Sequence, residues 1–163
     1  MVRIERANLE DVPEIKHVLS ETWRATYRSF LSEATINTVT SVWHDPKQLA
    51  AEIQNPHIFF GVAKLSDGVI IGLTTVGHIT DDTVVLSRLY VHPQFQGRGI
   101  GSQLLQAGST AFPRARIIRL EVEENNHPAY TFYQTHGFRH TASKEERVEA
   151  DVIKVVVTEK FIA

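Results

Sequence analysis

The sequence predicts a mixed α/β fold with antiparallel strands first, one parallel crossover in the middle and an antiparallel pair at the end. Two observations predict it. Runs of β-branched and aromatic residues over 57–91 are separated by short turn signals, which is typical of an antiparallel meander. A strand, a glycine-rich loop and an amphipathic helix then follow over 83–111, and another strand begins at Arg116, which indicates a βαβ unit.

Length and composition indicate one domain, residues 1–163, with 42% hydrophobic and 22% charged residues. The net charge of −2 favours neither nucleic acid nor an anionic membrane as a partner. No apolar run approaches the roughly 20 residues of a membrane helix, and the acidic, alternating N-terminus is unlike a signal peptide, so we expect a cytoplasmic protein. Without cysteine, disulfides and a cysteine acyl-enzyme are excluded, and the scattered histidines predict no metal site.

The N-terminal third is predicted to be one strand followed by helices. Residues 2–6 alternate and read as a strand, and Asn8 is a plausible N-cap for a helix over 9–24. Two shorter helices are expected over 33–43 and 46–54, the second because Asp45 precedes Pro46 at the position of a cap and first helical residue.

The remaining elements alternate between strands and helices. Strands are expected over 57–65 and 69–78, joined by a Ser66-Asp67-Gly68 turn, and over 83–91. The apolar spacing predicts a helix over 100–111. The other expected elements are a strand over 116–122, a helix over 128–136, a strand over 138–142, a charged connection over 143–151 that also reads as a solvated hairpin, and a last strand over 152–161.

The glycine-rich loop before the helix at Ile100 has the character of a phosphate site. Gly97, Gly99 and Gly101 leave backbone N–H groups accessible where the helix begins, and the helix dipole adds partial positive charge there. A P-loop is excluded because no Gly-Lys-Ser/Thr follows. A dinucleotide fingerprint is disfavoured because Ser102 replaces the third glycine and five residues separate the strand from the loop.

Two segments carry a family resemblance. Gln96-Gly97-Arg98-Gly99-Ile100-Gly101 resembles the pyrophosphate loop Gln/Arg-x-x-Gly-x-Gly/Ala of the GNAT superfamily of N-acetyltransferases, and Leu120–Phe138 resembles that family's next motif. The resemblance implies a mixed, mostly antiparallel sheet of about seven strands, flanked by helices, whose central parallel strands splay apart. It also implies acetyl-CoA as the co-substrate, with no metal.

The resemblance further implies a set of cofactor contacts. Backbone amides over 98–102 would bind the pyrophosphate, and an N–H at the end of the preceding strand, most plausibly that of Val91, would polarise the acetyl carbonyl. Asn126 would cap a helix and bond the pantetheine arm. The cofactor-binding residues expected on this basis are Leu89, Tyr90, Val91, Gln96, Gly97, Arg98, Gly99, Ile100, Gly101, Ser102, Asn126 and Tyr133.

Two residues are candidates for acid and base catalysis. Tyr133 matches the family tyrosine that protonates the leaving thiolate, although its helical stripe alone also suits a core aromatic. Glu121 matches a glutamate that some members use as a base toward the ammonium form of the acceptor. An ordinary solvated carboxylate explains it equally well. The resemblance predicts direct transfer in a ternary complex.

The acceptor is the least constrained part of the prediction. Trp23 and Tyr27 are expected to line the acceptor side, in a segment that loosely resembles polyamine acetyltransferases. A small-molecule amine, a polyamine and a protein N-terminus all stay open as acceptors, as does a homodimer. The competing hypothesis from another class is a non-catalytic acetyl-CoA-binding module with a regulatory role.

Overall fold

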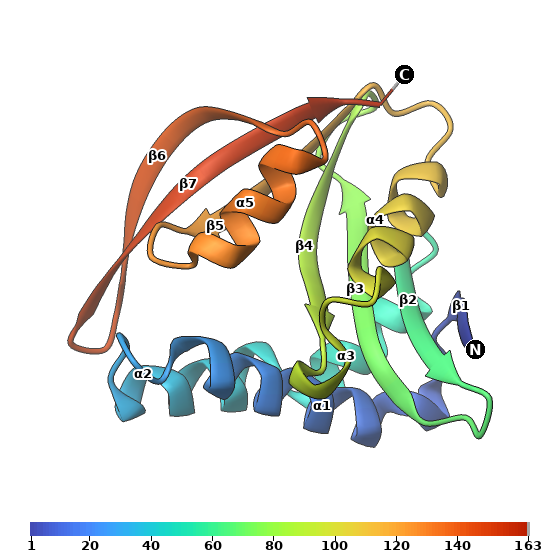
Figure 1. The fold of residues 1–163 in the computed structure, drawn as a ribbon, viewed down its shortest axis with the longest axis horizontal. Helices are drawn as coiled ribbons and strands as arrows, with labels where there is room; N and C mark the ends of the chain where they lie inside the picture. The colour runs from blue at the N-terminus through green and yellow to red at the C-terminus, as the bar shows by residue number, and fades with distance from the viewer. Residues whose placement is uncertain (163) are drawn as a thin grey trace.

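The chain forms one seven-stranded sheet with helices against both of its faces (Figure 1). The computed structural model describes residues 1–162. Its strands are β1 (Val2–Arg6), β2 (Ile58–Leu65), β3 (Ile70–His78), β4 (Thr83–Val91), β5 (Ile117–Glu123), β6 (Arg139–Val148) and β7 (Asp151–Phe161). The helices are η1 (Leu9–Asp11), α1 (Val12–Tyr27), α2 (Glu33–Thr38), η2 (Val39–Trp43), α3 (Pro46–Gln54), η3 (Pro93–Phe95), α4 (Ile100–Thr110) and α5 (His127–Thr135).

The strand order β1-β2-β3-β4-β5-β7-β6 confirms the predicted fold class. β1 to β4 pair antiparallel in sequence order, and β4 and β5 are the parallel pair joined by α4. β7 then inserts antiparallel between β5 and β6. The predicted crossover is thus the junction at which an N-terminal meander meets a C-terminal antiparallel unit.

The two central strands separate part of the way along their length. β4 pairs with β5 only from Thr83 to Leu86, opposite Ile117 to Leu120. The β3–β4 register shifts here, since Val76 faces Leu86 but Thr75 faces Arg88, so Ser87 is an extra residue in β4. Such a bulge bends its strand and ends regular pairing. The remainder of β4 stays with β3 while β5 stays with β7, which leaves the splay that the family resemblance implied.

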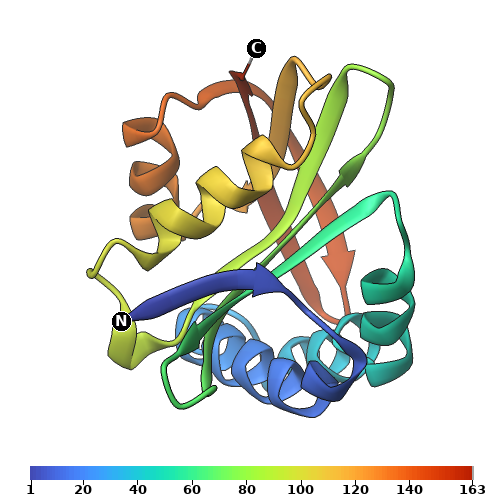
Figure 2. The ribbon, with the colours of Figure 1, turned by 90° about the vertical axis from the view of Figure 1, so that its right-hand side faces the viewer.

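Two groups of helices cover opposite faces of the sheet, as Figure 2 shows from the side of β1. On one face, α1 and α3 pack on β2 and β3 around Leu19, Leu49 and Leu73. On the other, Leu104 of α4 packs against Ile71, and Tyr133 of α5 packs with Leu120 and Val122 of β5. We call these the α1 face and the α5 face.

Local sequence explains where the helices begin. Asn8 accepts from the Glu10 N–H and forms a capping box with Asp11, so the chain enters η1 before α1 rather than one continuous helix from Leu9. Asp45 accepts from the Lys47 N–H, and Pro46 takes the first position of α3, as predicted. α1 continues to Tyr27, one turn beyond the predicted end at Arg24.

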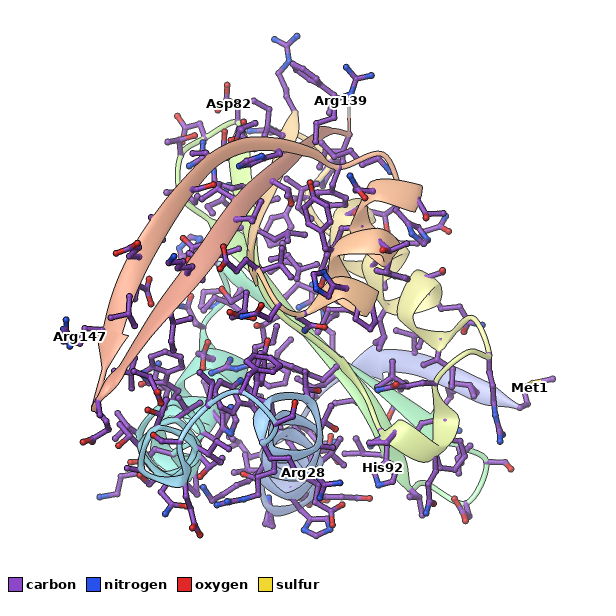
Figure 3. The ribbon with its side chains drawn as sticks, turned by 60° about the vertical axis from the view of Figure 1, so that its left-hand side comes forward. Met1, Arg28, Asp82, His92, Arg139 and Arg147 are labelled. Atoms are coloured by element: carbon purple, nitrogen blue, oxygen red, sulfur yellow. The ribbon has the colours of Figure 1, made fainter. Side chains whose placement is uncertain are left out.

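The C-terminal hairpin corrects one prediction. The segment expected as a strand over 138–142 and a charged connection over 143–151 is mostly one strand, β6, which extends to Val148. As the sheet's edge strand, β6 is exposed on nearly all of its residues, so its charged side chains stay in water while its backbone pairs with β7. Arg147, labelled in Figure 3, lies near the hairpin tip.

Candidate active site

The loop before α4 exposes backbone donors, as the glycine pattern predicted. Gly97 and Gly99 adopt φ values of +79° and +82°, a left-handed conformation that glycine tolerates far better than other residues. Gly99 is the N-cap and supplies no side chain, so the N–H groups of Ile100, Gly101 and Ser102 have no partner within the helix. These three amides and the helix dipole form a site suited to an anion, and we call them the cradle.

The cradle opens into a cleft of about 820 Å³ between the splayed strands and α5. Its walls come from the end of β4, the loop after it, the first turn of α4, α5 from its N-cap to its C-cap, and the last turns of α1. Most of the cofactor-binding residues predicted from the sequence lie on this wall: Leu89, Tyr90, Val91, Gln96, Gly97, Gly99, Ile100, Gly101, Ser102, Asn126 and Tyr133.

The end of β4 presents unused backbone groups to the cleft. The N–H of His92, labelled in Figure 3, donates to Ile71 of β3 at 2.8 Å. Because N–H groups alternate along an antiparallel strand, the Val91 N–H points away from β3, toward the splay. The Val91 carbonyl accepts from the Gln96 side chain at 2.9 Å, which ties the loop to the strand. Gln96 thus orients the cradle as well as lining the cleft.

Tyr133 combines the two roles that the sequence left open. Its ring packs with Phe138 and with the buried cluster around Leu120, and only 7% of the residue is exposed. The residue nevertheless lines the cleft. Burial, with a smaller contribution from nearby Tyr27, raises the pKa of Tyr133. The phenol is therefore held in its protonated form, the form in which it can donate a proton or a hydrogen bond.

Tyr27 of α1 and Asn126, the N-cap of α5, are joined by a hydrogen bond. Asn126 caps α5, accepting from the Ala129 N–H at 3.4 Å, and its side-chain nitrogen donates to the Tyr27 hydroxyl at 3.4 Å. Burial raises the pKa of Tyr27, as does the nearby charge of Glu123. Tyr27 and Trp23 are both buried in an aromatic cluster with Ile36, outside the cleft lining. Their predicted role toward the acceptor stays a prediction.

Glu121 lies on the α1 face, opposite Tyr133. Leu120 and Val122 pack with Tyr133 on the α5 face, so the alternation of β5 places Glu121 on the other side. Its carboxylate binds the Lys144 ammonium of β6 at 2.6 Å, and its side chain is 39% exposed. Lys144 also contacts Glu146 at 3.3 Å. Tyr133 lines the cleft, whereas Glu121 lies on the opposite face of the sheet and is not part of the cleft lining, so its role as a base stays a prediction.

Glu123 is a second carboxylate on the α1 face, at the end of β5. It is 7% exposed, and burial raises its pKa. The backbone and side-chain nitrogens of Asn125 donate to it at 2.7 and 3.1 Å. These bonds fix the turn that leads into the Asn126 cap, which gives Glu123 a structural explanation.

Arg98 lies away from the cleft wall. Its guanidinium sits over the Phe95 ring, 5.1 Å from the ring centre, so it contributes charge near the cradle without lining the cleft. Sequence reasoning missed other wall residues, among them Phe132 and His136 of α5 and Thr22 and Thr26 of α1. Helical spacing from Tyr133 could have identified Phe132 and His136, whereas nothing local marks the two threonines.

Neither a membrane-spanning helix nor a metal-binding group of side chains is found in the part of the chain that the structure describes. No helix within residues 1–162 has both the length and the apolar character to cross a membrane. No group of three histidine, aspartate or glutamate side chains in the same range is arranged to hold a metal ion.

Comparison with known proteins identifies the family to which this fold and cleft belong. Residues 15–138 match the acetyltransferase (GNAT) family. The chain belongs to this family and is an N-acetyltransferase.

Individual proteins that the chain resembles are also named N-acetyltransferases. The chain is 27% identical over 144 residues to spermidine N(1)-acetyltransferase of Thermoplasma acidophilum, covering 85% of this chain and 88% of the relative. It is 30% identical over 97 residues to the N-alpha-acetyltransferase RimI of Mycobacterium tuberculosis, covering 58% and 60% of the two chains. The crystal structure of PaiA N-acetyltransferase from Thermoplasma acidophilum in complex with coenzyme A superposes with a TM-score of 0.84 at 25% identity, covering 99% of both chains.

Proposed function

We propose that this N-acetyltransferase binds acetyl-CoA in the cleft and transfers the acetyl group directly to a primary amine of a small polyamine-like molecule. The observation that supports this proposal most is the splay itself, where the residues of the cradle, Val91 with its unpaired N–H, and Tyr133 line one continuous cleft. Acetyl-CoA, when bound, supplies the activated acetyl group. Cradle amides suit its pyrophosphate, and the absence of side chains at Gly97 and Gly99 permits close approach.

The chain's own residues would then divide the work. The Val91 N–H stabilises negative charge on the carbonyl oxygen, as an oxyanion-hole donor does. Tyr133 donates its proton to the departing thiolate, and its raised pKa means that donation accompanies cleavage of the carbon–sulfur bond. Glu121 takes the proton of the acceptor ammonium from the opposite face. With no cysteine in the chain, direct transfer in a ternary complex is the simplest route.

Side-chain contacts on the α1 face support a small cationic acceptor. Glu121 and Glu146 already bind the Lys144 ammonium at 2.6 and 3.3 Å, so the pair is suited to an alkylammonium group. A polyamine carries several such groups. The relative named spermidine N(1)-acetyltransferase also aligns over more of this chain than the RimI relative does.

The β6–β7 hairpin supports a restricted acceptor entrance. Asp151 accepts from the Ser32 N–H at 2.9 Å, the Ser32 hydroxyl at 2.7 Å and the Thr35 hydroxyl at 2.6 Å. Thr38 adds a bond to Glu149 at 2.6 Å. These bonds fix the hairpin tip beside α2, where Figure 1 places it, and we propose that the fixed tip limits the entrance for the acceptor.

An acceptor panel tests the proposal. Release of free CoA thiol is measured with spermidine, a monoamine of similar length and peptides with free N-termini. We expect spermidine to give the highest kcat/KM. Turnover of the peptides alone would overturn the polyamine-like acceptor, and saturable CoA binding without turnover of any amine would support the non-catalytic binding module instead.

A further inference from the structure

We propose that His136 is a positioning residue for the cradle: its protonated ring frees the Ser102 hydroxyl to bind a phosphate of the cofactor and adds positive charge beside it. The inference rests on the proposed function, because it assigns a new residue to the proposed acetyl-CoA site. Both residues line the cleft, and they come from different helices, Ser102 from the first turn of α4 and His136 from the end of α5.

The hydrogen bonds of His136 define its tautomer. Nδ1 lies 2.8 Å from the Phe132 carbonyl oxygen, which can only accept, so Nδ1 carries a proton. Nε2 lies 2.9 Å from the Ser102 hydroxyl. The ring also packs against Phe132, with 4.2 Å between ring centres. Since the ring is held at both nitrogens, its protonation state decides which way the Ser102 hydroxyl points.

The two protonation states present different groups to a phosphate. In the neutral ring Nε2 has no hydrogen, so it accepts from Ser102 and turns the hydroxyl hydrogen away from the cradle. In the protonated ring Nε2 donates to the Ser102 oxygen, which releases the hydroxyl hydrogen toward the cradle. The released donor and the ring charge both favour an anion.

The charges around His136 are mostly positive, which disfavours ring protonation but attracts an anion. α4 contains no charged residue, and its polar groups near the ring are Ser102 and the cradle amides. From β7, the Lys160 side chain passes within 3.5 Å of the Cβ position at Gly137. Within residues 1–162, no carboxylate forms an ion pair with His136. The other titratable groups on the adjoining segments are His92, Arg98, His127, Tyr130, Tyr133, Arg139, His140 and, on β7, Glu159, which pairs with Arg119.

The consequence is a pH-dependent affinity. Ring protonation and phosphate binding favour one another, so each must strengthen the other by the same factor. Cofactor affinity should therefore be higher at acidic pH, where the ring is protonated, than at basic pH, where it is neutral, with kcat unaffected by this effect.

Calorimetric titration with dephospho-CoA tests the inference. This probe keeps the pyrophosphate and lacks the 3′-phosphate, whose own titration near pH 6 would confuse the result. For the unaltered protein, Kd should be about fivefold lower at about pH 5.5 than at about pH 8. His136→Gln should abolish the difference, and Ser102→Ala should reduce it, because the charge of the protonated ring remains in that variant. His127→Gln, a substitution on α5 outside the cleft lining, is the matched control and should retain it.

The outcomes separate this inference from the proposed function. If the unaltered protein binds the probe with the same Kd at both pH values, if His136→Gln retains the difference, or if Ser102→Ala retains it undiminished, the role of His136 is overturned while the proposed function stands. Should His136→Gln fail to fold, Ser102→Ala decides alone: a reduced difference supports the role of His136, and an undiminished one overturns it. If the unaltered protein binds neither CoA nor dephospho-CoA, the proposed function itself fails.

Discussion

The proposed cofactor side and the proposed acceptor side of the splay are built from different chemical groups. On the cofactor side the donors are backbone amides, those of Ile100 to Ser102 and of Val91. On the acceptor side the polar groups are side chains, held in the Glu121–Lys144 ion pair and in the bonds from Ser32 and Thr35 to Asp151. Backbone donors suit any member that carries the same cofactor, whereas side chains can vary with the acceptor.

The largest expected effect concerns Tyr133, the proposed acid. Tyr133→Phe keeps the ring and its packing but removes the proton donor, so we expect kcat to fall by about 10³-fold with little change in the KM for acetyl-CoA. Steady-state kinetics measure both constants. Tyr130→Phe on the same helix, outside the cleft lining, is the control. An unchanged kcat in Tyr133→Phe would remove this residue as the acid.

The next effect concerns Glu121 on the acceptor side. Glu121→Gln should lower kcat by about 10²-fold and abolish the acidic limb of the pH–rate profile, because the amide cannot take the acceptor's proton. The loss is smaller than for Tyr133 because water reaches this half-exposed side chain and can replace it in part. Glu146→Gln removes the other carboxylate on Lys144 and should keep the limb. A limb that persists in Glu121→Gln would point to another base.

A glycine substitution tests the backbone character of the cofactor side. Gly99→Ala places a Cβ at φ +82°, and we expect the Kd for CoA to rise about tenfold because the strained loop misplaces the cradle amides. Gly68→Ala is a close control, since Gly68 has φ +89° in the β2–β3 turn, with open space around it, as at Gly99. Both variants should lose stability, by about 1–2 kcal/mol, and equal losses of CoA affinity would contradict a specific cradle.

The smallest expected effect concerns the hairpin. Asp151→Ala removes the acceptor of three bonds to α2, and we expect the acceptor KM to rise about fivefold with the KM for acetyl-CoA unchanged. The hydroxyls of Thr35 and Ser32 lower the pKa of Asp151 from its ordinary value, so the carboxylate form, and with it the docking, should persist as the pH falls and be lost only when the pH drops through that lowered pKa. If only the KM for acetyl-CoA rises, the hairpin does not act on acceptor binding.

The contrast also explains what could be predicted from the sequence. The cradle depends on Gly97, Gly99 and the residues beside them, so a contiguous pattern was enough to predict it. The Ser32–Asp151 bonds join residues 119 positions apart, and no local pattern reports them. The sequence predicts too short a strand for β6 because the consecutive charged residues Lys144 to Arg147 resemble a solvated connection, and only pairing with β7 makes them a strand.

The central claim is that cofactor and acceptor meet in one complex, with the acid and the base on opposite sides of the splay. Initial rates measured over a grid of acetyl-CoA and acceptor concentrations test it most directly. The account predicts double-reciprocal lines that intersect, as direct transfer in a ternary complex requires. Parallel lines, together with an acetylated protein when acetyl-CoA is supplied without acceptor, would contradict it.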